Sequence, residues 1–371
     1  MRRRELVLAL PGFLASGAGP RTAAAAGDAT GSTGTGADAV PAVRLPFDFG
    51  SHPQARTEWW YATGSLDAGA DTWGFQVTFF RAATRIAASQ PSRFAARELV
   101  FAHAAVTDLA GRKLRHDQRI ARSGFGIAEA RVGETDVTLR DWRFVRQGGT
   151  EASRYRAQVA SDAAGFSLEF ALDATQPPLL QGSGGVSRKG PEPGSYSHYY
   201  SEPQLAVTGT LRLDGTSHGV HGRAWLDHEW SDAYLDPQAA GWDWIGMNLD
   251  DGSALMAFRM RRKDGGMLWA GGSFRPRGGT ARDFAPGEVA FAPRRWWRSP
   301  ASNARYPVEW EVATPAGRHV VHALLDDQEL DSRASTGAIY WEGLSDLLDA
   351  RGARVGRGYL EMTGYAAALT L

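Results

Sequence analysis

The stretch GRAWLDHEWSDAYLDPQAAGWDWIG, residues 222–246, places titratable side chains among indole rings. An ordinary core excludes unpaired charges, and an ordinary surface exposes few large rings. The stretch therefore fits either an active site or the wall of a barrel. Its acidic and histidine residues are Asp227, His228, Glu229, Asp232, Asp236 and Asp243, and its tryptophans are Trp225, Trp230, Trp242 and Trp244.

Short runs of alternating apolar and polar residues recur on both sides of this stretch. Each run is bounded by Gly or Asp, which is typical of antiparallel strands joined by turns. Helical patterns are scarce, and the two candidates are 82–99 and 343–352. The sequence predicts an all-β protein with few short helices. The clearest runs are TWGFQVTFFR (72–81), DVTLRDWRFV (136–145), FSLEFALDA (166–174), SALMAFRMRRKDGG (253–266) and YPVEWEVATPAG (306–317).

A Pro- and Gly-rich break at 176–203 interrupts the strand pattern. We place a domain junction at 191–203, which predicts an N-terminal barrel at 45–190 and a C-terminal barrel at 204–371. A weak internal echo supports two similar halves, because 58–81 and 241–261 both run from paired tryptophans through an Asp/Gly turn to a strand that ends in Arg. Closing each half into a barrel removes exposed strand edges.

The chain begins with three arginines, a short apolar run broken by Pro11, and a series of small residues. This order is typical of an export signal, which we assign to 1–26, and Arg3-Arg4 also fits the twin-arginine pattern. Residues 27–44, rich in Ala, Gly, Thr and Ser, are predicted to be a flexible leader. We therefore expect a secreted or periplasmic protein.

Composition narrows the class of ligand. The formal net charge of the 371 residues is zero, which removes the general electrostatic reason to bind nucleic acid. No segment after the signal approaches the roughly 20 uninterrupted apolar residues of a membrane span, so no stable transmembrane insertion is expected. The absence of cysteine excludes thiol catalysis and Cys-based metal sites. With 13 Trp, 16 Phe and 10 Tyr, the chain is suited to an apolar small-molecule ligand.

Several segments in order along the chain resemble the AttH-like family of secreted lipocalin-like proteins related to carotenoid 1,2-hydratase. The resemblance spans roughly 45–371, in both halves. It is carried by HPQARTEWWYATGSL (52–66), GFQVTFFR (74–81), LLQGSGGVSRKGPEPGSYSHYYSEPQLAVTGTL (179–211), GRAWLDHEWSD (222–232), GWDWIGMNLDDGSALMAFRMR (241–261) and YWEG (340–343).

This resemblance implies two lipocalin-like (calycin) antiparallel β-barrels packed together. Members of the family are often labelled secreted hydrolases, some are encoded beside ABC-type transport components, and others are hydratases or pericyclase-like catalysts. An envelope transporter is therefore one expected partner. The motifs DHEWSD and GWDWIGMNLDDG differ in sequence from those of the pigment-specific enzymes, which argues against a carotenoid substrate. Residues matched by position to the acidic and aromatic cluster of the hydratases are Asp227, His228, Trp230, Trp242 and Asp243.

The cluster contains the parts needed to hydrate an alkene. A carboxyl group enclosed by indole rings is poorly solvated, so its pKa rises and it can act as a general acid. Asp227 and Asp243 are the candidate acids, and His228 is the candidate group that positions water or takes its proton. The indole faces of Trp230, Trp242 and Trp244 suit a developing cation. Tyr199, Tyr200 and Glu229 are further candidate ligand-binding residues, and the domain junction is a candidate place for the cavity.

Structural interpretations compete with these roles. Lipocalin-like barrels commonly begin with a G-x-W strand whose Trp closes one barrel end and packs on an Arg, a pattern that EWWY (58–61) and GWDW (241–244) fit. This predicts a structural closure role for Glu58, Trp59, Trp60, Arg81 and Arg259, and it also covers Trp242 and Trp244. Likewise, the acidic residues and His228 fit a buried polar network that holds the two barrels in register.

Two other chemistries find less support in the sequence. No G-x-S-x-G elbow is present, and Ser231 next to His228 and Asp227 in sequence does not predict triad geometry. A metal site built from Asp227, His228 and Glu229 lacks a recognised spacing, so neither a metal nor a cofactor is predicted. The leading hypothesis is hydratase- or isomerase-type acid–base chemistry on a polyene, isoprenoid or lipid-like molecule. The alternative is a non-catalytic carrier of such a molecule, or an accessory protein of a transport system.

Overall fold

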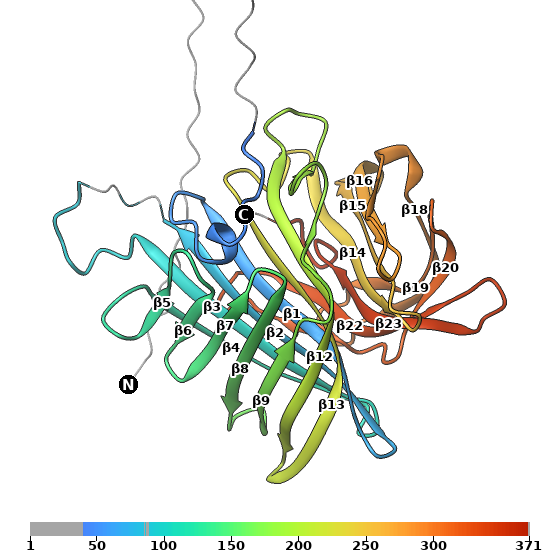
Figure 1. Cartoon of the computed structure of the whole chain (residues 1–371), viewed down its shortest axis with the longest axis horizontal. Coiled ribbons are helices and arrows are strands. Elements are labelled where there is room, and N and C mark those ends of the chain that lie inside the picture. Colours follow the sequence, from blue (N-terminus) through green and yellow to red (C-terminus); the bar gives the residue numbers. More distant parts are fainter. Residues whose placement is uncertain (1–39, 85, 87–88, 370–371) are drawn as a thin grey trace, which may run out of the picture. The chain divides into compact units, whose positions relative to one another are not determined.

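The computed structural model in Figure 1 describes residues 40–84, 86 and 89–369. The predicted export signal and most of the predicted leader lie outside these residues. Within the leader's described part, Val43 is buried, and its backbone N–H donates to the carbonyl of Gly184 at 2.9 Å. Packed structure therefore begins slightly before the expected start at Leu45.

The first sheet contains thirteen antiparallel strands in the order β4-β3-β2-β1-β13-β12-β9-β8-β7-β6-β5, with β10 and β11 paired to β12. Its end strands β3 and β4 contact β5 and β6, so the sheet curls into a nearly closed barrel (Figure 1). The strands are β1 (Thr57–Ala68), β2 (Asp71–Ala83), β3 (Glu98–Asp108), β4 (Lys113–Arg122), β5 (Ala128–Ala130), β6 (Asp136–Leu139), β7 (Trp142–Gly149), β8 (Ala152–Ser161), β9 (Phe166–Asp173), β10 (Leu179–Leu180), β11 (Val186–Arg188), β12 (Tyr196–Leu213) and β13 (Thr216–Ser231).

The second sheet contains ten antiparallel strands in the order β17-β16-β15-β14-β23-β22-β20-β19-β18, with β21 paired to β22. Figure 1 shows it in yellow to red beside the blue and green first sheet. The strands are β14 (Ala239–Leu249), β15 (Ala254–Arg262), β16 (Met267–Arg275), β17 (Arg282–Phe284), β18 (Ala290–Arg298), β19 (Arg305–Thr314), β20 (Gly317–Ala323), β21 (Glu329–Asp331), β22 (Ile339–Leu348) and β23 (Arg354–Met362).

The predicted all-β, lipocalin-like class with few short helices is confirmed; of the two antiparallel sheets, which were predicted to form two barrels, the first is a nearly closed barrel. The helices are two 3₁₀ turns, η1 (Phe47–Phe49) and η2 (Pro286–Glu288). Both predicted helix candidates were wrong: 82–99 covers the end of β2, a connection and the start of β3, whereas 343–352 covers β22 and a turn. Residues 340–345 of β22 are all buried, so their apolar run lacks the alternation that marks a half-exposed strand.

The change from one sheet to the other occurs at 232–238, between β13 and β14. The junction expected at 191–203 lies earlier, because β12 and β13 extend the first sheet instead of opening the second. The Pro- and Gly-rich segment is not a free linker. It carries the short strands β10 and β11, which pair with β12 along the first sheet.

Strand alternation sends one set of side chains into the core enclosed by each sheet and the other set between the sheets. In β2, Phe75, Val77 and Phe79 belong to the core of the first barrel, so the intervening Gln76 and Thr78 point to the opposite face. That face is covered, because β1 contacts β23 and β2 contacts β22. The strands next to the second sheet are therefore buried on both faces.

Glycine at position 222 is required by the close pairing of β13 with β1. A Cβ atom at Gly222 would lie 1.9 Å from the carbonyl oxygen of Ser65, whereas one at Gly219 in the same strand would meet nothing within 4 Å. We predict that Gly222→Ala lowers the free energy of unfolding by about 1–3 kcal/mol, the usual cost of overpacking. Gly219→Ala is the matched control for thermal denaturation, and equal melting temperatures for the two variants would contradict this account.

Candidate active site between the sheets

A cavity lies between the two sheets. Its walls come from β1, β2, β3 and β13 of the first sheet and from β14, β22 and β23 of the second. The space free of atoms is about 990 Å³, including the part open to solvent. Pockets that bind small molecules typically form where two structural units meet, with mostly apolar walls and a few polar groups.

Aromatic rings form much of the cavity wall. Trp59, Trp242 and Trp244 all line it, as does Tyr234. Tyr234 makes edge contacts with Trp59 and Trp242 at centroid separations of 4.8 and 5.2 Å. These contacts hold the rings in fixed orientations. The predicted ligand-binding residues Trp242 and Trp244 therefore lie in the cavity wall, together with Trp59, which was expected to close a barrel.

Asp227 presents a buried carboxyl group to this cavity. Its Oδ1 accepts hydrogen bonds from the hydroxyl of Ser201 and from the indole N–H of Trp225, both at 2.6 Å. Burial raises the pKa of Asp227 from 3.8 to about 7; hydrogen bonds oppose the rise, and the charge of Glu229 adds to it. A third hydrogen bond, with the hydroxyl of Tyr199, also opposes the rise. Asp227 therefore keeps its proton to a higher pH than an ordinary aspartate does.

Glu229 lies two residues along β13 and lines the same cavity. Its Oε1 pairs with Nζ of Lys189 at 2.8 Å and also accepts from the hydroxyl of Ser197. Burial raises the pKa of Glu229, while the positive charge of Lys189 opposes that rise. The ammonium group of Lys189 also lies 4.4 Å from the ring centroid of Phe258 and 4.8 Å from that of Tyr199.

Two further carboxyl groups come from the second sheet. Glu342 of β22 and Glu361 of β23 are directly opposite one another in the antiparallel pair, and both line the cavity. Burial raises the pKa of each, and the proximity of Glu361 raises that of Glu342 further. Opposed like charges in a buried site disfavour ionisation. This wall of the cavity is therefore acidic in composition but largely neutral in charge.

Three cavity-lining side chains carry buried polar atoms that make no hydrogen bond of normal geometry, namely the hydroxyl of Tyr61, Oε1 of Gln76 and Oε1 of Glu342. Tyr61 and Glu342 interact with each other, so of the three only Oε1 of Gln76 is left without any partner. A buried polar group that remains unpaired costs about 1–3 kcal/mol, so such groups are uncommon unless a ligand or water completes them. The position of this unpaired oxygen in the cavity wall indicates a binding site.

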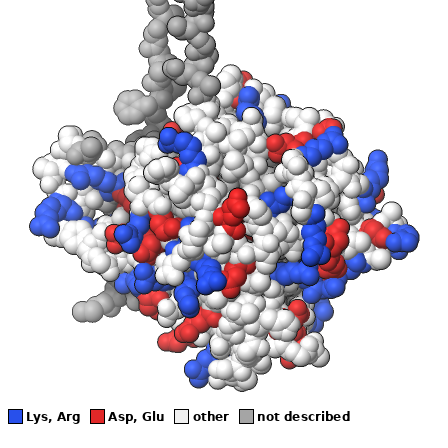
Figure 2. All heavy atoms as spheres, viewed as in Figure 1, with Lys and Arg blue, Asp and Glu red and all other residues white. Residues whose placement is uncertain are grey.

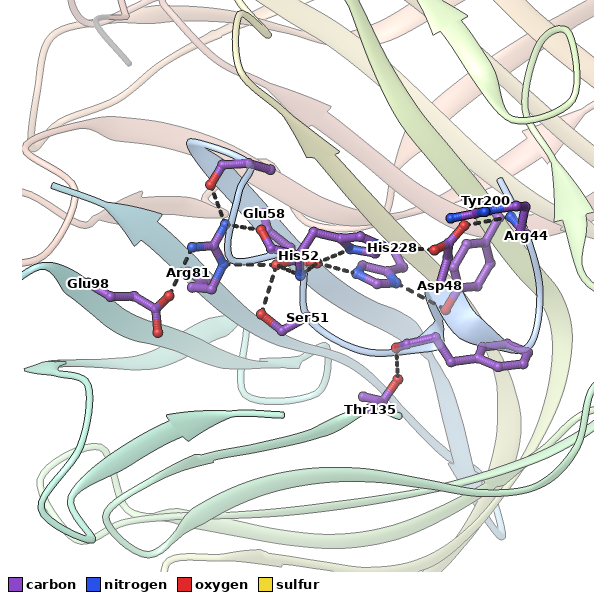
Figure 3. A network of polar contacts seen from close by, with 12 residues as sticks. Arg44, Asp48, Ser51, His52, Glu58, Arg81, Glu98, Thr135, Tyr200 and His228 are labelled. Atoms are coloured by element: carbon purple, nitrogen blue, oxygen red, sulfur yellow. Dashed lines mark hydrogen bonds and ion pairs between the residues drawn. The ribbon is translucent and has the colours of Figure 1, made fainter. Parts of the chain in front are cut away.

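His228 points the other way, toward the end of the first barrel. Figure 3 shows Glu58 between His52, Arg81 and His228. Its Oε1 lies 2.7 Å from Nδ1 of His52 and 2.9 Å from Nε2 of His228, and its Oε2 accepts from Nε of Arg81 at 2.9 Å. The hydroxyl of Tyr200 lies 3.1 Å from the other nitrogen of His228. Glu58 and Arg81 also reach the cavity wall.

This network fixes the charge of Glu58 in spite of its burial. Burial alone would raise the pKa of Glu58, but hydrogen bonds and positive potential from His228 and His52 hold it well below the usual range. Burial lowers the pKa of His228, whereas contacts with Asp48 and Glu58 raise that of His52 against the effect of burial. The arrangement is that of an internal ion-pair network, not of a base that faces the cavity.

The same trio is the one group of metal-ligating side chains found among the described residues. Ligand atoms of His52, Glu58 and His228 lie within 4.8 Å of one another. However, both oxygens of Glu58 already accept hydrogen bonds, and the guanidinium of Arg81 is one of the donors. The fixed positive charge of Arg81 opposes a cation at this position.

Asp243 is also placed away from the cavity lining. Its Oδ2 pairs with Nε of Arg259 at 2.7 Å and with Nε of Arg261 at 3.2 Å, and its Oδ1 accepts from the hydroxyl of Tyr365 at 2.8 Å. Arg259 lies over the ring of Trp310 in the second core. Strand alternation explains why Asp243 does not line the cavity, since Trp242 and Trp244 flank it in sequence and occupy the opposite face of β14.

The remaining residues that were predicted to bind ligand or to close a barrel lie either at the end of the first barrel or near the cavity. Trp230 stacks on His52 with ring centroids 3.7 Å apart, and Tyr200 packs edge-on against Phe49, so both lie at the end of the first barrel. Trp60 stacks on His228 at 4.7 Å within the first core. Tyr199 supports the cavity from behind, since its hydroxyl accepts from the indole N–H of Trp244 at 3.2 Å.

Sequence reasoning missed the cavity-lining residues that come from β2, β3, β22 and β23. Gln76, His103, Tyr340, Glu342 and Glu361 all line the cavity. The available signal was polar residues inside strongly apolar runs, such as Gln76 within TWGFQVTFFR and Glu342 within YWEG. Nothing in the local pattern indicates that these strands meet.

Outside the cavity, the face shown in Figure 2 carries Lys and Arg interspersed with Asp and Glu. In the described part of the chain, no helix has the length and apolar character required to cross a bilayer.

The fold and site thus define an all-β protein whose two antiparallel sheets enclose an aromatic cavity lined with protonatable carboxyl groups. The AttH-like family model matches residues 37–365, and the chain belongs to this family. No curated protein sequence matches this chain.

Solved structures agree with this assignment. The crystal structure of a candidate AttH protein from Nitrosomonas europaea is 49% identical, with a TM-score of 0.80 over 88% of this chain and 98% of that one. Kievitone hydratase from Nectria haematococca is 14% identical, with a TM-score of 0.67 over 90% and 96% of the two chains. CghA is 15% identical, with a TM-score of 0.50 over 89% and 96%. The last two likenesses establish a shared fold.

Removing the carboxylate of Glu58 is predicted to destabilise the first barrel strongly. Glu58→Gln leaves the buried guanidinium of Arg81 with only the partly exposed Glu98 as counter-charge, and breaking a buried pair usually costs about 3–5 kcal/mol. Asp214→Asn is the control, because it removes an ion pair with Arg115 in which the Asp214 side chain is 67% exposed; exposed pairs contribute about 0–1 kcal/mol. Chemical denaturation at neutral pH measures both, and similar losses would refute a special role for the buried network.

The raised pKa of Asp227 predicts a pH dependence of stability. The folded-state value of about 7 lies above the ordinary 3.8, so between these values the folded protein keeps a proton that the unfolded chain releases. Stability therefore falls as pH rises through this window. Asp227→Asn cannot ionise, so wild type should lose on the order of 2–4 kcal/mol relative to it between about pH 4 and pH 7. A pH-independent difference between their unfolding free energies would show that Asp227 is ionised throughout.

Proposed function

We propose that this protein is a hydratase-type acid–base catalyst that acts on an apolar small molecule held between its two sheets. The observation that carries the proposal is the carboxyl group of Asp227, which is buried among indole rings and has a pKa raised to about 7. An acid strong enough to protonate carbon must reach the substrate in its neutral form, and this environment keeps it neutral.

The reaction begins with proton transfer from the carboxyl group of Asp227 to one carbon of an alkene. The π electron pair forms the new C–H bond, the adjacent carbon becomes cationic, and Asp227 becomes a carboxylate. A water molecule then adds through oxygen to the cationic carbon and forms the C–O bond. The extra proton on that oxygen returns to Asp227, which restores the neutral acid. The net change is the addition of one water to the alkene.

The surrounding groups support each stage. The faces of Trp59, Trp242 and Trp244 attract a developing cation, at about 0.5–2 kcal/mol per ring or somewhat more when water is excluded. The hydroxyl of Ser201 and the indole of Trp225 stabilise the transient carboxylate of Asp227 by donating to its Oδ1. If the cation instead loses a proton from a neighbouring carbon to the carboxylate of Asp227, a new double bond forms, the neutral acid is restored, and the same site performs an isomerisation.

Serine hydrolysis finds no comparable support. The hydroxyl of Ser231 donates to the backbone carbonyl of Tyr196 at 2.6 Å, and His228 is committed to Glu58 and Tyr200. Family membership is compatible with hydration, because a protein of the same fold is named kievitone hydratase. That likeness concerns the fold, and the assignment of chemistry to this chain rests on its own cavity.

The test measures the incorporation of isotopically labelled water into the product. Wild-type protein incubated with an organic extract of apolar metabolites in isotopically labelled water should release products that are heavier than their precursors by one labelled water. Asp227→Asn should slow this incorporation by about 10²–10⁴-fold, the usual contribution of a general acid. Mass spectrometry of the extracted products measures both rates.

Asp173→Asn is the control, because Asp173 is an exposed aspartate of β9 outside the cavity; it should match wild type. Retention of the same unmodified molecule by wild type and Asp227→Asn, seen by native mass spectrometry, would replace catalysis with the carrier function. Label incorporation that is insensitive to Asp227→Asn would assign the acid to another residue.

A further inference from the structure

The part of the cavity formed by β2 and β3, two or more strands away from Asp227, and by β22 of the second sheet has a different chemistry. It is formed by Gln76 and Thr78 of β2, His103 of β3 and Tyr340 of β22, all of which are buried. These groups are amides, hydroxyls and an imidazole in place of carboxyls. They belong to a hydrogen-bonded chain that connects the two sheets, and this chain determines what Gln76 offers to a ligand.

The chain starts at Gln118. Its Nε2 donates to the backbone carbonyl of Asp331 at 2.7 Å, so its Oε1 is the acceptor that faces Ser335 at 2.6 Å. The other oxygen in reach of the Ser335 hydroxyl, the carbonyl of Ser332 at 3.2 Å, is also only an acceptor. The hydrogen of Ser335 therefore points away from His103 in either case.

His103 must then donate to Ser335. Its Nε2 lies 2.8 Å from the Ser335 oxygen, whose hydrogen is already used. Burial and the neighbouring His116 lower the pKa of His103 to about 3, so the ring is neutral and carries only this one hydrogen. Nδ1 is consequently an acceptor. Tyr340, at 2.8 Å from Nδ1, is the group that donates to it.

The orientation of the Gln76 amide follows from the last step. Because the hydroxyl hydrogen of Tyr340 is directed at His103, its oxygen can only accept from Gln76. Nε2 of Gln76 lies 3.3 Å from that oxygen and 2.8 Å from the hydroxyl of Thr78. Turning the amide over would bring two acceptor oxygens together. Gln76 is thereby held with its Oε1 unpartnered, and the side chain is only 2% exposed.

We propose that the cavity takes an amphipathic molecule that carries a hydroxyl group, and that Oε1 of Gln76 selects this group by accepting its hydrogen. This inference rests on the proposed function, which requires the same cavity, and it narrows the substrate class from any apolar alkene to a hydroxylated one. The hydroxyl end lies toward β2 and the reacting carbon toward Asp227 of β13. A pure hydrocarbon would leave the Gln76 carbonyl buried and unpaired, which is a strong basis for discrimination.

The test measures binding without chemistry, using saturated probes in matched pairs. Dodecanol is compared with dodecyl methyl ether, and menthol with menthyl methyl ether. Methylation removes the hydrogen-bond donor and keeps the oxygen and the carbon skeleton. By isothermal titration calorimetry, wild type should bind at least one alcohol about tenfold or more tightly than its ether, because an unmatched buried carbonyl is costly.

Gln76→Met keeps the length of the side chain and removes the acceptor. It should reduce alcohol affinity to that of the ether and leave ether affinity unchanged or improved. Gln158→Met is the matched control, because Gln158 is exposed on β8 outside the cavity; it should bind as wild type does. Tyr340→Phe provides a second variant that releases the Gln76 amide from its fixed orientation, and it should lower the alcohol-to-ether ratio while ether binding persists.

Equal affinity of wild type for alcohol and ether would overturn the proposal, as would a preference that survives in Gln76→Met. Failure of every alcohol to bind would overturn it as well, since both a linear and a cyclic skeleton are offered. The comparison on wild type needs no variant to fold. Because the probes contain no alkene, this result is independent of label incorporation from water. If wild type shows no preference for alcohols but still incorporates label, only the hydroxyl-binding proposal is refuted. If wild type prefers alcohols but incorporates no label, only the hydration proposal is refuted.

Discussion

The second half of strand β13 is buried on both of its faces, and the chemistry of the molecule depends on which way each side chain of this half points. From Ala224 to Ser231 every residue is buried. The period of two sends Asp227 and Glu229 to the cavity between the sheets and sends His228 and Trp230 to the end of the first barrel. A strand with one solvated face would leave these carboxyl groups ionised. Burial on the second face is what makes a neutral acid available.

Each sheet contains a corresponding carboxylate–arginine pair. Glu58 faces Arg81 across β1 and β2, and Asp243 faces Arg259 across β14 and β15. Both pairs are adjacent to large aromatic rings, and each is a direct ion contact. The weak echo between 58–81 and 241–261 in the sequence therefore corresponds to a repeated structural device. This explains why Asp243, although embedded in the Trp-rich stretch, belongs with Glu58 and not with Asp227.

The fold was predictable because strand alternation and turn residues are local signals, and several segments resemble a known family. The site was predictable only in part. Asp227, Glu229, Trp242 and Trp244 lie within one short stretch, whereas Gln76 and Tyr340 meet across 264 positions of sequence. A pattern of period two also does not state which face is which when both are buried, so His228 and Asp227 could not be separated before the strand partners were known.

Glu58 and Asp227 share full burial but differ in charge, and their partners account for the difference. Glu58 contacts the guanidinium of Arg81 and two imidazoles, so it is ionised. Asp227 contacts only neutral donors, so it keeps its proton at higher pH. A charged partner this close would have lowered the pKa of Asp227 and removed its use as an acid.

The Pro- and Gly-rich segment between β9 and β12 influences this balance from outside the barrels. It carries Lys189, which is buried against Tyr199 and Phe258 and pairs with Glu229. The charge of Lys189 favours the ionised form of Glu229, and the charge of Glu229 in turn raises the pKa of Asp227. The segment therefore does more than connect strands: Lys189 limits the rise in the pKa of Glu229, and Glu229 adds to the rise that burial produces in the pKa of Asp227.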